Sequence, residues 1–522
     1  MNPAEIIALS ATVLAEKIAS GALSALDAVE AHIARIGAVN PKINAVVVNR
    51  FEAARAEARE ADAKRARGEP LGALHGLPVT IKDSLDVAGL PSTFGLPTRA
   101  AHRAERDETH VARLRAAGAI VLGKTNVSQC LAYTEADNPL YGRTNNPWNA
   151  ARTSGGSSGG EGAIIATGGS TLGLGTDIGG SVRVPAAFCG IASLKPTTGR
   201  IDDPGEFSFS PGQRAILSQV GVLARTAADV ALGYRVAATP TAADRASMPM
   251  GDPAQVQLSS LRVAYYNSDG SFETGPAVKR AVQQAGAALA AAGAQVSAWP
   301  PPDVPEASRL FGSIMTADGG AHLRRVLDGS PVTPQVKQLL FGAGLSGVTL
   351  AVLRRAMRLL RQPSLLENLE TFGAHTTDRY WTLVAQQERY RDRFTRALDE
   401  APDGPFDMIV APVCALPAFT HGATRELLTA GAYAVLYNLL GWPAGVVPVT
   451  RVRADEETLR SPSRDVAQKL ARQIELGSAG LPIGVQLIGR PWQEHVVLAA
   501  MAAVERAARE QAGFPVTPVE PL

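Results

Sequence analysis

Short hydrophobic runs alternate with longer amphipathic segments along most of the chain. The short runs predict buried strands at 44–49, 77–82, 119–122, 171–175, 215–222, 261–266, 294–298, 407–411, 444–450 and 482–488. The periodic segments predict helices at 51–68, 110–117, 161–167, 226–238, 275–292, 429–440, 465–476 and 494–510. Strands and helices interleaved in this way predict an α/β fold, with a large mixed, mostly parallel central sheet covered by helices on both faces.

Two parts of the chain lack this alternation. Residues 1–40 predict a helical segment, because their apolar residues recur at helical spacing. Residues 300–405 begin with three prolines and then predict only helices, so we expect a helical insertion that shapes the substrate pocket. No internal repeat is visible, and we expect residues 1–522 to form a single domain.

A basic amphipathic helix is predicted inside this insertion, at 350–362 (LAVLRRAMRLLRQ). The simplest interpretation is a helix that packs on the protein body and leaves its arginines in water. The alternative is a surface for peripheral membrane contact or for a protein partner.

Composition and charge narrow the class of protein. A chain of 522 residues with 46% hydrophobic residues can form a large core. Its net charge of +2, spread along the chain, gives no reason to expect nucleic acid as a partner. The three cysteines, Cys130, Cys189 and Cys414, lack C-x-x-C spacing, which argues for a reducing compartment and against a disulfide framework or zinc. There is no signal-peptide pattern and no apolar run of about 18 residues. We therefore expect a cytoplasmic enzyme.

The candidate chemistry lies in a glycine-rich stretch between residues 155 and 200. Its first cluster, GGSSGG, contains Ser157, and its second cluster, DIGGS, ends in Ser181. Glycines around a hydroxyl suggest that another group approaches the main chain closely. The predicted helix and strand between the two clusters can fold back and bring both hydroxyls to one strand end.

A serine nucleophile needs a base that accepts its proton. None of the eight histidines lies in a glycine-rich turn, although a Ser-His-Asp site stays open because its members need only meet in space. Lys82, at the end of the predicted strand 77–82, is the alternative base, since burial would favour its neutral form. A solvated charge at a strand end is the competing interpretation of Lys82.

Two other motifs in the chain match patterns of different chemistry. Residues 118–125 satisfy the P-loop pattern, but their four middle residues form the predicted strand rather than a loop after it. Residues 155–159 satisfy the nucleophile-elbow pattern without the apolar strand that should precede it. We therefore expect neither nucleotide binding nor an elbow.

The chain resembles the amidase signature family at these residues. The resemblance rests on Lys82 in PVTIKD, Ser157 in GGSSGG and Ser181 in GTDIGGSVRVPAAFCG, and it extends over nearly the whole chain. Within the family the chain is most similar to the fatty acid amide hydrolase branch, through NPLYGRTNNPW, YNLLGWPAGVVPVTRV and GLPIGVQLIGRPWQE. The aromatic residues of the acyl channel in that branch are not matched by Cys130-Leu131-Ala132-Tyr133, so a lipid substrate does not follow.

The resemblance implies a Ser-Ser-Lys triad. Ser181 would be the nucleophile, and Ser157, after a cis peptide bond, would relay its proton to neutral Lys82. The remaining roles fall on the second glycine cluster and its neighbours. Backbone amides of Ile178, Gly179, Gly180 and Ser181 would form the oxyanion hole, while Asp177, Arg183 and Ser158 would support the site without touching substrate.

These observations predict an amidase that forms an acyl-enzyme on a small-molecule amide, with no metal and no cofactor. An esterase or carbamate hydrolase would use the same triad, and a lipid amide hydrolase would add membrane docking through 350–362. Ammonia supply for transamidation of misacylated tRNA, which would need partner subunits, also occurs in the family. A non-catalytic scaffold is the alternative outside enzymes, and a homodimer stays open.

Overall fold

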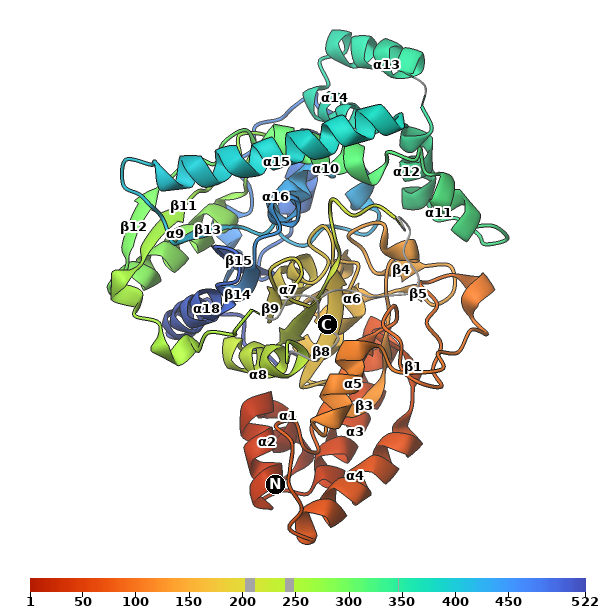
Figure 1. Ribbon diagram of the computed structural model, residues 1–522, viewed down its shortest axis with the longest axis vertical. Helices are drawn as coiled ribbons and strands as arrows, with labels where there is room; N and C mark the ends of the chain where they lie inside the picture. Colours follow the sequence, from red (N-terminus) through yellow and green to blue (C-terminus); the bar gives the residue numbers. More distant parts are fainter. Residues whose placement is uncertain (202–211, 240–247, 346) are drawn as a thin grey trace.

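An eleven-stranded sheet forms the framework of the molecule, as the computed structural model shows (Figure 1). The structure describes residues 1–201, 212–239, 248–345 and 347–522. Across the sheet the strands follow in the order β1 (Val46–Asn49), β3 (Ile120–Thr125), β2 (Pro78–Lys82), β8 (Leu172–Asp177), β10 (Gln219–Ala224), β9 (Ala192–Lys195), β14 (Ala444–Arg451), β15 (Pro482–Gly489), β13 (Met408–Pro412), β11 (Arg262–Tyr265) and β12 (Gln295–Ala298).

Helices make up much of the remaining chain. They are α1 (Pro3–Ala8), α2 (Ala11–Ser20), α3 (Ala25–Ile43), α4 (Phe51–Ala66), α5 (Thr109–Ala116), α6 (Gly159–Ala166), α7 (Arg183–Cys189), α8 (Ala227–Ala237), α9 (Pro276–Ala291), α10 (Val304–Met315), α11 (Ala321–Val326), α12 (Pro334–Ala343), α13 (Gly347–Leu359), α14 (Pro363–Glu370), α15 (Thr377–Asp399), α16 (Ala432–Leu440), α17 (Val466–Glu475) and α18 (Glu494–Arg509). The helices predicted between the strands begin and end within three residues of the observed ones.

The expected large mixed sheet is confirmed, but the expected excess of parallel pairs is wrong. Four of the ten adjacent pairs are parallel: β2 with β3, β2 with β8, β11 with β12 and β11 with β13. The other six pairs are antiparallel.

Two similar units explain the antiparallel pairs. The chain passes from β8 through α7 to β9, which runs parallel to β8, and β10 then lies between them and antiparallel to both. In the same way β13, α16 and β14 form a crossover, and β15 lies between its two strands. Each crossover leaves one position free, which the following strand fills from the opposite direction. The alternation of strands and helices along the sequence is the same whether or not a later strand lies between the two parallel strands. The sequence therefore could not reveal the positions of β10 and β15.

Helices cover both faces of the sheet. The helix α7 packs against β14 and β15, and α18 packs against β14 and β15 as well. Glycines show that these contacts lie on opposite faces. A Cβ atom added at Gly484 would lie 3.3 Å from Cα of Ala187 in α7, whereas one added at Gly445 would lie 2.2 Å from Sδ of Met501 in α18. Side chains alternate between the two faces along paired strands, so these two glycines face opposite layers.

Strand boundaries differ from prediction in a few places. The strand expected at 215–222 lies at Gln219–Ala224, and Ala192–Lys195 forms a strand that no pattern indicated. The strand β3 continues through Thr125, so the glycine and lysine of the P-loop-like pattern belong to the strand as well. Lys124 Nζ donates to the Pro91 carbonyl and to Ser92 Oγ, each at 2.9 Å. No phosphate-binding loop exists there.

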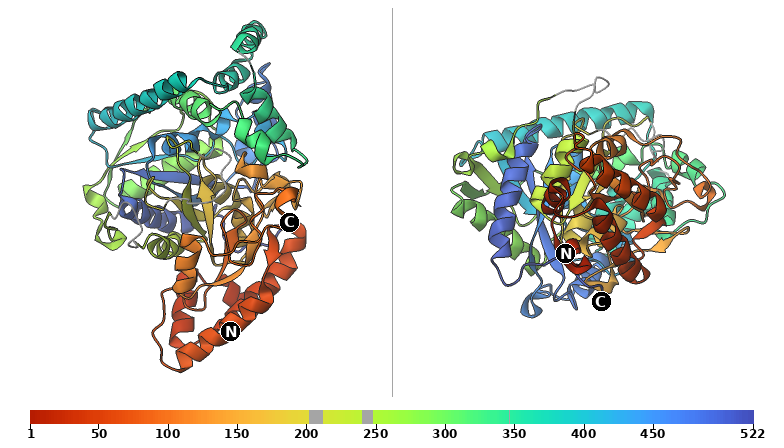
Figure 2. Two further views of the ribbon diagram at one scale, coloured as in Figure 1. Left: turned by 45° about the vertical axis from the view of Figure 1, so that its right-hand side comes forward. Right: turned by 90° about the horizontal axis from the view of Figure 1, so that it is seen from below.

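The helices of residues 300–405 lie together beyond one end of the sheet, and α1 to α4 lie at the opposite end (Figures 1 and 2). The insertion is helical as expected, with α13 projecting farthest from the body. Most buried apolar side chains between Ile6 and Phe514 form one core. A second, smaller cluster consists of Phe94, Leu96, Cys130, Leu323, Leu327 and Val336. The single domain 1–522 stays a prediction. Within the described ranges no single helix has the length and hydropathy to span a membrane. Taken together, α12 and α13 have the length and composition of a membrane-spanning segment, but the pair is bent by 111°.

Candidate active site

Lys82 lies where the carboxyl ends of β2 and β8 come together, because these strands are parallel neighbours. Its side chain is fully buried. Its Nζ donates to Oγ of Ser157 at 2.7 Å, to Oγ1 of Thr176 at 2.8 Å and to the carbonyl of Thr176 at 3.3 Å. The alternative interpretation of Lys82 as a solvated charge at a strand end is therefore wrong.

The two serines lie in loops that are joined through the backbone. The peptide bond between Gly156 and Ser157 is cis, and the N–H of Ser158 donates to the carbonyl of Ser181 at 3.1 Å. Ser157 is 1% exposed, whereas Ser181 is 7% exposed and lines a cavity. The structure thus brings Lys82 and Ser157 into contact and places Ser181 in the adjoining loop, at the cavity wall.

A buried acid, Glu161, lies in the first turn of α6. Its Oε1 accepts a hydrogen bond from Oγ1 of Thr125 at 2.9 Å, and its Oε2 lies 2.6 Å from Oγ1 of Thr80. Thr80 Oγ1 is also 3.0 Å from Oγ of Ser170, whose own proton is donated to the carbonyl of Leu172 at 2.9 Å. Oγ1 of Thr80 donates to Oε2 of Glu161 and also lies within hydrogen-bond distance of Oγ of Ser170.

Burial of Glu161 favours its neutral form. Burial raises the pKa of Glu161 to about 8, against the lowering effect of its bonds from Thr80 and Thr125 and of the charge of Lys82. The protonation of Glu161 affects Lys82 in turn, because a carboxylate at this place would favour the charged amine. A neutral Glu161 does not exert this effect on Lys82.

Two glycines of β8 make room for the first turn of α6. A Cβ atom at Gly173 would lie 2.0 Å from Oε2 of Glu161, and one at Gly175 would lie 2.7 Å from Oγ of Ser158. Because these glycines are two residues apart, they face the same side of the strand. The pattern G-L-G therefore lets α6 lie directly against β8.

A network of buried polar side chains supports the loop that contains Ser181. Asp177 accepts from Nε of Arg183 at 3.0 Å and from the N–H of Gly180 at 2.8 Å. Asn438 donates to Oδ1 of Asp177 at 2.9 Å and accepts from Nη2 of Arg183 at 2.5 Å. Gln486 accepts from Nη1 of Arg183 at 2.9 Å. Burial alone would raise the pKa of the Asp177 carboxyl, but the Arg183 guanidinium holds it well below its usual range.

Backbone amides of this loop differ in their availability. The N–H of Gly180 is already bonded to Asp177, so the expectation that it belongs to an oxyanion hole does not fit this geometry. The amides of Ile178, Gly179 and Ser181 form no hydrogen bond to another residue of the described chain. Gly180 has a φ of 107°, which turns its peptide toward Asp177 and favours glycine.

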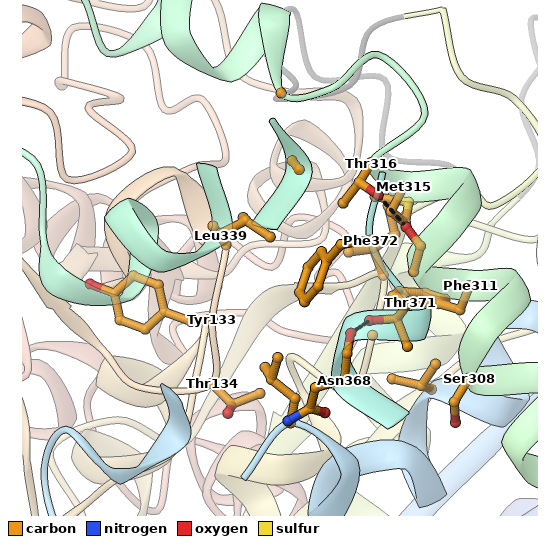
Figure 3. A pocket seen from close by; sticks show the side chains of 18 of the residues that line it. Tyr133, Thr134, Ser308, Phe311, Met315, Thr316, Leu339, Asn368, Thr371 and Phe372 are labelled. Atoms are coloured by element: carbon orange, nitrogen blue, oxygen red, sulfur yellow. Dashed lines mark hydrogen bonds between the residues drawn. The ribbon is translucent and has the colours of Figure 1, made fainter. Parts of the chain in front are cut away.

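A cavity of about 220 Å³ opens at Ser181 and is lined mainly by apolar side chains (Figure 3). Its wall combines the loop after β3, the loop after β8, the helical insertion and the start of α16. The apolar side chains are Leu131, Ala132, Tyr133, Ile178, Phe311, Met315, Leu323, Leu339, Leu340, Ala343, Phe372, Leu428, Ala432 and Val435. The insertion forms part of this wall, and its role in shaping a substrate pocket stays a prediction.

Sequence reasoning missed several residues of the site. Glu161, Asn438 and Gln486 are each a polar residue within an apolar run: GEGAIIA, AYAVLYNLL and PIGVQLIG. All three are buried. A polar residue inside a predicted buried element was the available signal, because such groups are usually hydrogen-bonded in the interior.

Comparisons with known proteins agree with this geometry. Residues 27–498 match the family model "Amidase". The chain is 35% identical over 516 residues to "Fatty-acid amide hydrolase 1" of Sus scrofa, covering 96% of this chain and 86% of that protein. It is 31% identical over 513 residues to "Indoleacetamide hydrolase" of Bradyrhizobium diazoefficiens, with the same coverage of each. A solved structure of "Fatty acid amide hydrolase" superposes with a TM-score of 0.84 at 25% identity, covering 98% of this chain and 87% of that one.

Proposed function

Because the chain belongs to the amidase family, we propose that it hydrolyses a carboxamide to a carboxylate and an amine or ammonia through a Ser-Ser-Lys triad. One observation carries the proposal: the bond of 2.7 Å from Nζ of Lys82 to Oγ of Ser157, in the loop that adjoins Ser181 at the cavity wall. A buried amine in contact with a serine hydroxyl is a suitable base for serine chemistry.

Acylation begins when Oγ of Ser181 forms a bond to the substrate carbonyl carbon. Its proton passes to Oγ of Ser157, which gives its own proton to the neutral amine of Lys82. When the tetrahedral intermediate collapses, the C–N bond breaks and the leaving nitrogen takes a proton from Ser157, which recovers one from Lys82. The amine leaves, and the acyl group stays on Ser181 as an ester.

Deacylation repeats the same transfers with water as the nucleophile. Water loses a proton through Ser157 to Lys82 and bonds to the ester carbon, and Oγ of Ser181 leaves with the returned proton. The negative oxygen formed in both steps needs amide donors. The amides of Ile178, Gly179 and Ser181 supply them, since Gly180 is bonded to Asp177. Each such donor is worth about 3 kcal/mol of transition-state stabilisation.

The base role of Lys82 is tested by Lys82→Ala. We expect amide turnover to be lost and the acidic limb of the rate profile to disappear with it. Lys124→Met is the matched control, because Lys124 is the fully buried lysine of the neighbouring strand β3 and binds Pro91 and Ser92 instead. Substantial amide turnover by Lys82→Ala at neutral pH would refute the role.

The relay role of Ser157 is tested by comparing amides with activated esters. An amine must be protonated to leave, whereas an activated alcohol leaves without help, so Ser157→Ala should reduce amide turnover more than ester turnover. Equal losses on both substrates would contradict the relay. The same comparison in the unsubstituted enzyme decides whether amides, esters or carbamates are the preferred substrate.

The lining of the cavity supports an amide with an apolar acyl or aryl part. The relatives differ in this respect, since one is named for fatty-acid amides and the other for indoleacetamide. Product release by mass spectrometry, across amides of rising acyl length and aryl anilides, separates these classes. Ser181→Ala is the control, and a fluorophosphonate should label Ser181 in the unsubstituted protein. Absence of both labelling and turnover would refute the proposed function and favour a non-catalytic scaffold.

Membrane docking is a second element of the proposal, supported by exposed apolar side chains on the insertion. Phe341 on α12 and Val348, Val352 and Leu359 on α13 are between 64% and 77% exposed. The helix α12 also lines the cavity through Leu339, Leu340 and Ala343. Exposed arginines follow the same stretch, at Arg355, Arg358 and Arg361. Apolar side chains flanked by arginines favour the surface of an anionic bilayer.

Vesicle sedimentation tests this docking. We expect the protein to sediment with vesicles that contain phosphatidylserine and less with vesicles of phosphatidylcholine alone. Val348→Ser combined with Val352→Ser should abolish the difference. Val516→Ser is the control, because Val516 is 68% exposed and lies close in sequence to the C-terminus, which is distant from α13 in Figure 1. Equal sedimentation of all variants would leave α13 as a lid without membrane contact.

Location and assembly stay predictions. The three cysteines are buried and unpaired, which is consistent with the cytoplasmic location expected from their spacing. Cell fractionation tests the location, and light scattering after size exclusion tests the homodimer. Co-purification of other subunits would instead favour transamidation.

A further inference from the structure

A polar side chain without a hydrogen-bond partner, that of Asn368, lies in the mainly apolar cavity wall. Asn368, on α14, is 8% exposed and lines the cavity (Figure 3). Its backbone carbonyl accepts from the N–H and the hydroxyl of Thr371, at 3.2 and 2.7 Å. Its side-chain amide forms no hydrogen bond to any residue of the described ranges. A buried carboxamide therefore faces the cavity with its donor and acceptor capacity unused.

Other polar side chains of the wall differ from Asn368, because their polar atoms are already hydrogen-bonded or are inaccessible from the cavity. Thr316 donates its hydroxyl to the carbonyl of Gly312 at 2.8 Å. Both carboxylate oxygens of Asp318 accept backbone N–H groups, from Gly320 and His322. The hydroxyls of Ser308 and Thr429 also lack a partner among the described residues, but they are buried in the wall itself and out of reach of a ligand.

Thr134 adds an available hydroxyl to the cavity wall, near the candidate catalytic residues. It lines the cavity, and its backbone lies against Gly156, where an added Cβ would come within 2.8 Å of the Thr134 carbonyl carbon. The peptide of Gly156 is the cis bond to Ser157. No described residue accepts or donates a hydrogen bond at its hydroxyl. Besides Ser181, the cavity thus has accessible neutral polar groups at Thr134 and at Asn368, in a wall that is mainly apolar.

Unpaired polar groups in an apolar wall indicate a ligand that pairs with them. Burial of a carboxamide without a hydrogen bond is unfavourable. An apolar ligand that fills this cavity would displace water and leave the carboxamide of Asn368 buried without a hydrogen bond. A ligand with a neutral hydrogen-bonding group at the right place would instead satisfy it, and a site built in this way discriminates strongly against an analogue that lacks the group.

We propose that the preferred substrate is an amide whose apolar part carries a second neutral polar group, a hydroxyl or another amide, which Asn368 binds inside the cavity. Asn368 is then a specificity-determining residue. The inference rests on the proposed function, since it assumes that the cavity at Ser181 holds the substrate.

Kinetics on matched amides test the inference. The substrates are amides of one chain length, either unsubstituted or with a hydroxyl moved along the chain one carbon at a time. We expect one hydroxyl position to raise kcat/KM about tenfold or more over the unsubstituted amide. Asn368→Leu, which keeps the size of the side chain, should remove that preference. Thr316→Val is the control, because its hydroxyl is already bonded to the backbone and the ratio should stay within about twofold.

Binding to Ser181→Ala gives the same comparison without turnover. Isothermal titration calorimetry should show about tenfold tighter binding of the preferred hydroxylated amide, and Asn368→Leu in the same background should abolish the difference. If every hydroxylated amide is hydrolysed and bound no better than the unsubstituted one, or if Asn368→Leu keeps the preference, the inference is overturned. In that case hydrolysis itself, and labelling of Ser181, would still support the proposed function.

Discussion

Replacing Glu161 with glutamine should change how the stability of this protein depends on pH. Burial raises the pKa of Glu161 to about 8 in the folded state, from its usual value of about 4.5. Between these two values the folded protein holds a proton on Glu161 that the unfolded chain has lost. The folded state therefore binds more protons, and its stability falls as pH rises from about 4.5 to about 8. Glutamine at 161 does not titrate, so the variant should not show this loss.

The expected size follows from the structure. A difference of one pH unit within this window corresponds to about 1.4 kcal/mol for a single titrating group. From pH 5.5 to pH 7.5 the variant should therefore gain about 3 kcal/mol relative to the unsubstituted protein. With an unfolding entropy of about 2.1 cal/mol/K per residue, this gain corresponds to a relative rise of about 3 °C in Tm.

Thermal unfolding at several pH values is the assay, and the quantity of interest is the difference in Tm between the two proteins. The amide of glutamine can donate to Thr80 and its oxygen can accept from Thr125, so the bonds at Oε1 and Oε2 persist. Any fixed cost of the substitution is the same at each pH and does not affect the slope. Thr167→Val, at the opposite end of the same buried helix, is a non-titrating control. A difference in Tm that is constant from pH 5.5 to 7.5 would refute a neutral Glu161 in the folded protein.

Three further substitutions test the support of the site. Gly173→Ala places a Cβ 2.0 Å from Oε2 of Glu161, and overpacking of about 1–3 kcal/mol should lower Tm; an unchanged Tm would contradict the close contact. Asp177→Asn removes the carboxylate that pairs with Arg183 and should lower the free energy of unfolding by about 3–5 kcal/mol. Urea unfolding measures the change, and an unchanged midpoint would contradict the importance of the pair. Asn438→Leu should lower kcat about tenfold with little change in KM, because Asn438 binds Asp177 and Arg183 and does not line the cavity. A rise in KM alone would argue for direct substrate contact.

The local chemistry of the site was predictable because it depends on residues that are contiguous in the sequence. The clusters GGSSGG and DIGGS and the strand PVTIK have the composition that their backbone geometry requires. The helices between the strands were predictable for a similar reason, since hydrophobic periodicity depends on neighbours three and four residues apart. The pair of Asp177 with Arg183 lies within one loop and turn and belongs to the same class of local information.

The sequence alone determined the element types, the family resemblance and the candidate triad of this protein. Only the tertiary structure decided the strand order, in which β10 and β15 enter between parallel partners, and the exclusion of Gly180 from the proposed oxyanion hole. It also decided the contacts of Glu161, Asn438 and Asn368. Glu161 and Asn438 bind residues that are distant in the sequence, and Asn368 lines a cavity whose other walls come from distant segments. The physical reason is the range of the interactions. Backbone propensity and periodicity act between near neighbours, whereas burial, protonation and cavity lining depend on which distant segments the fold brings together.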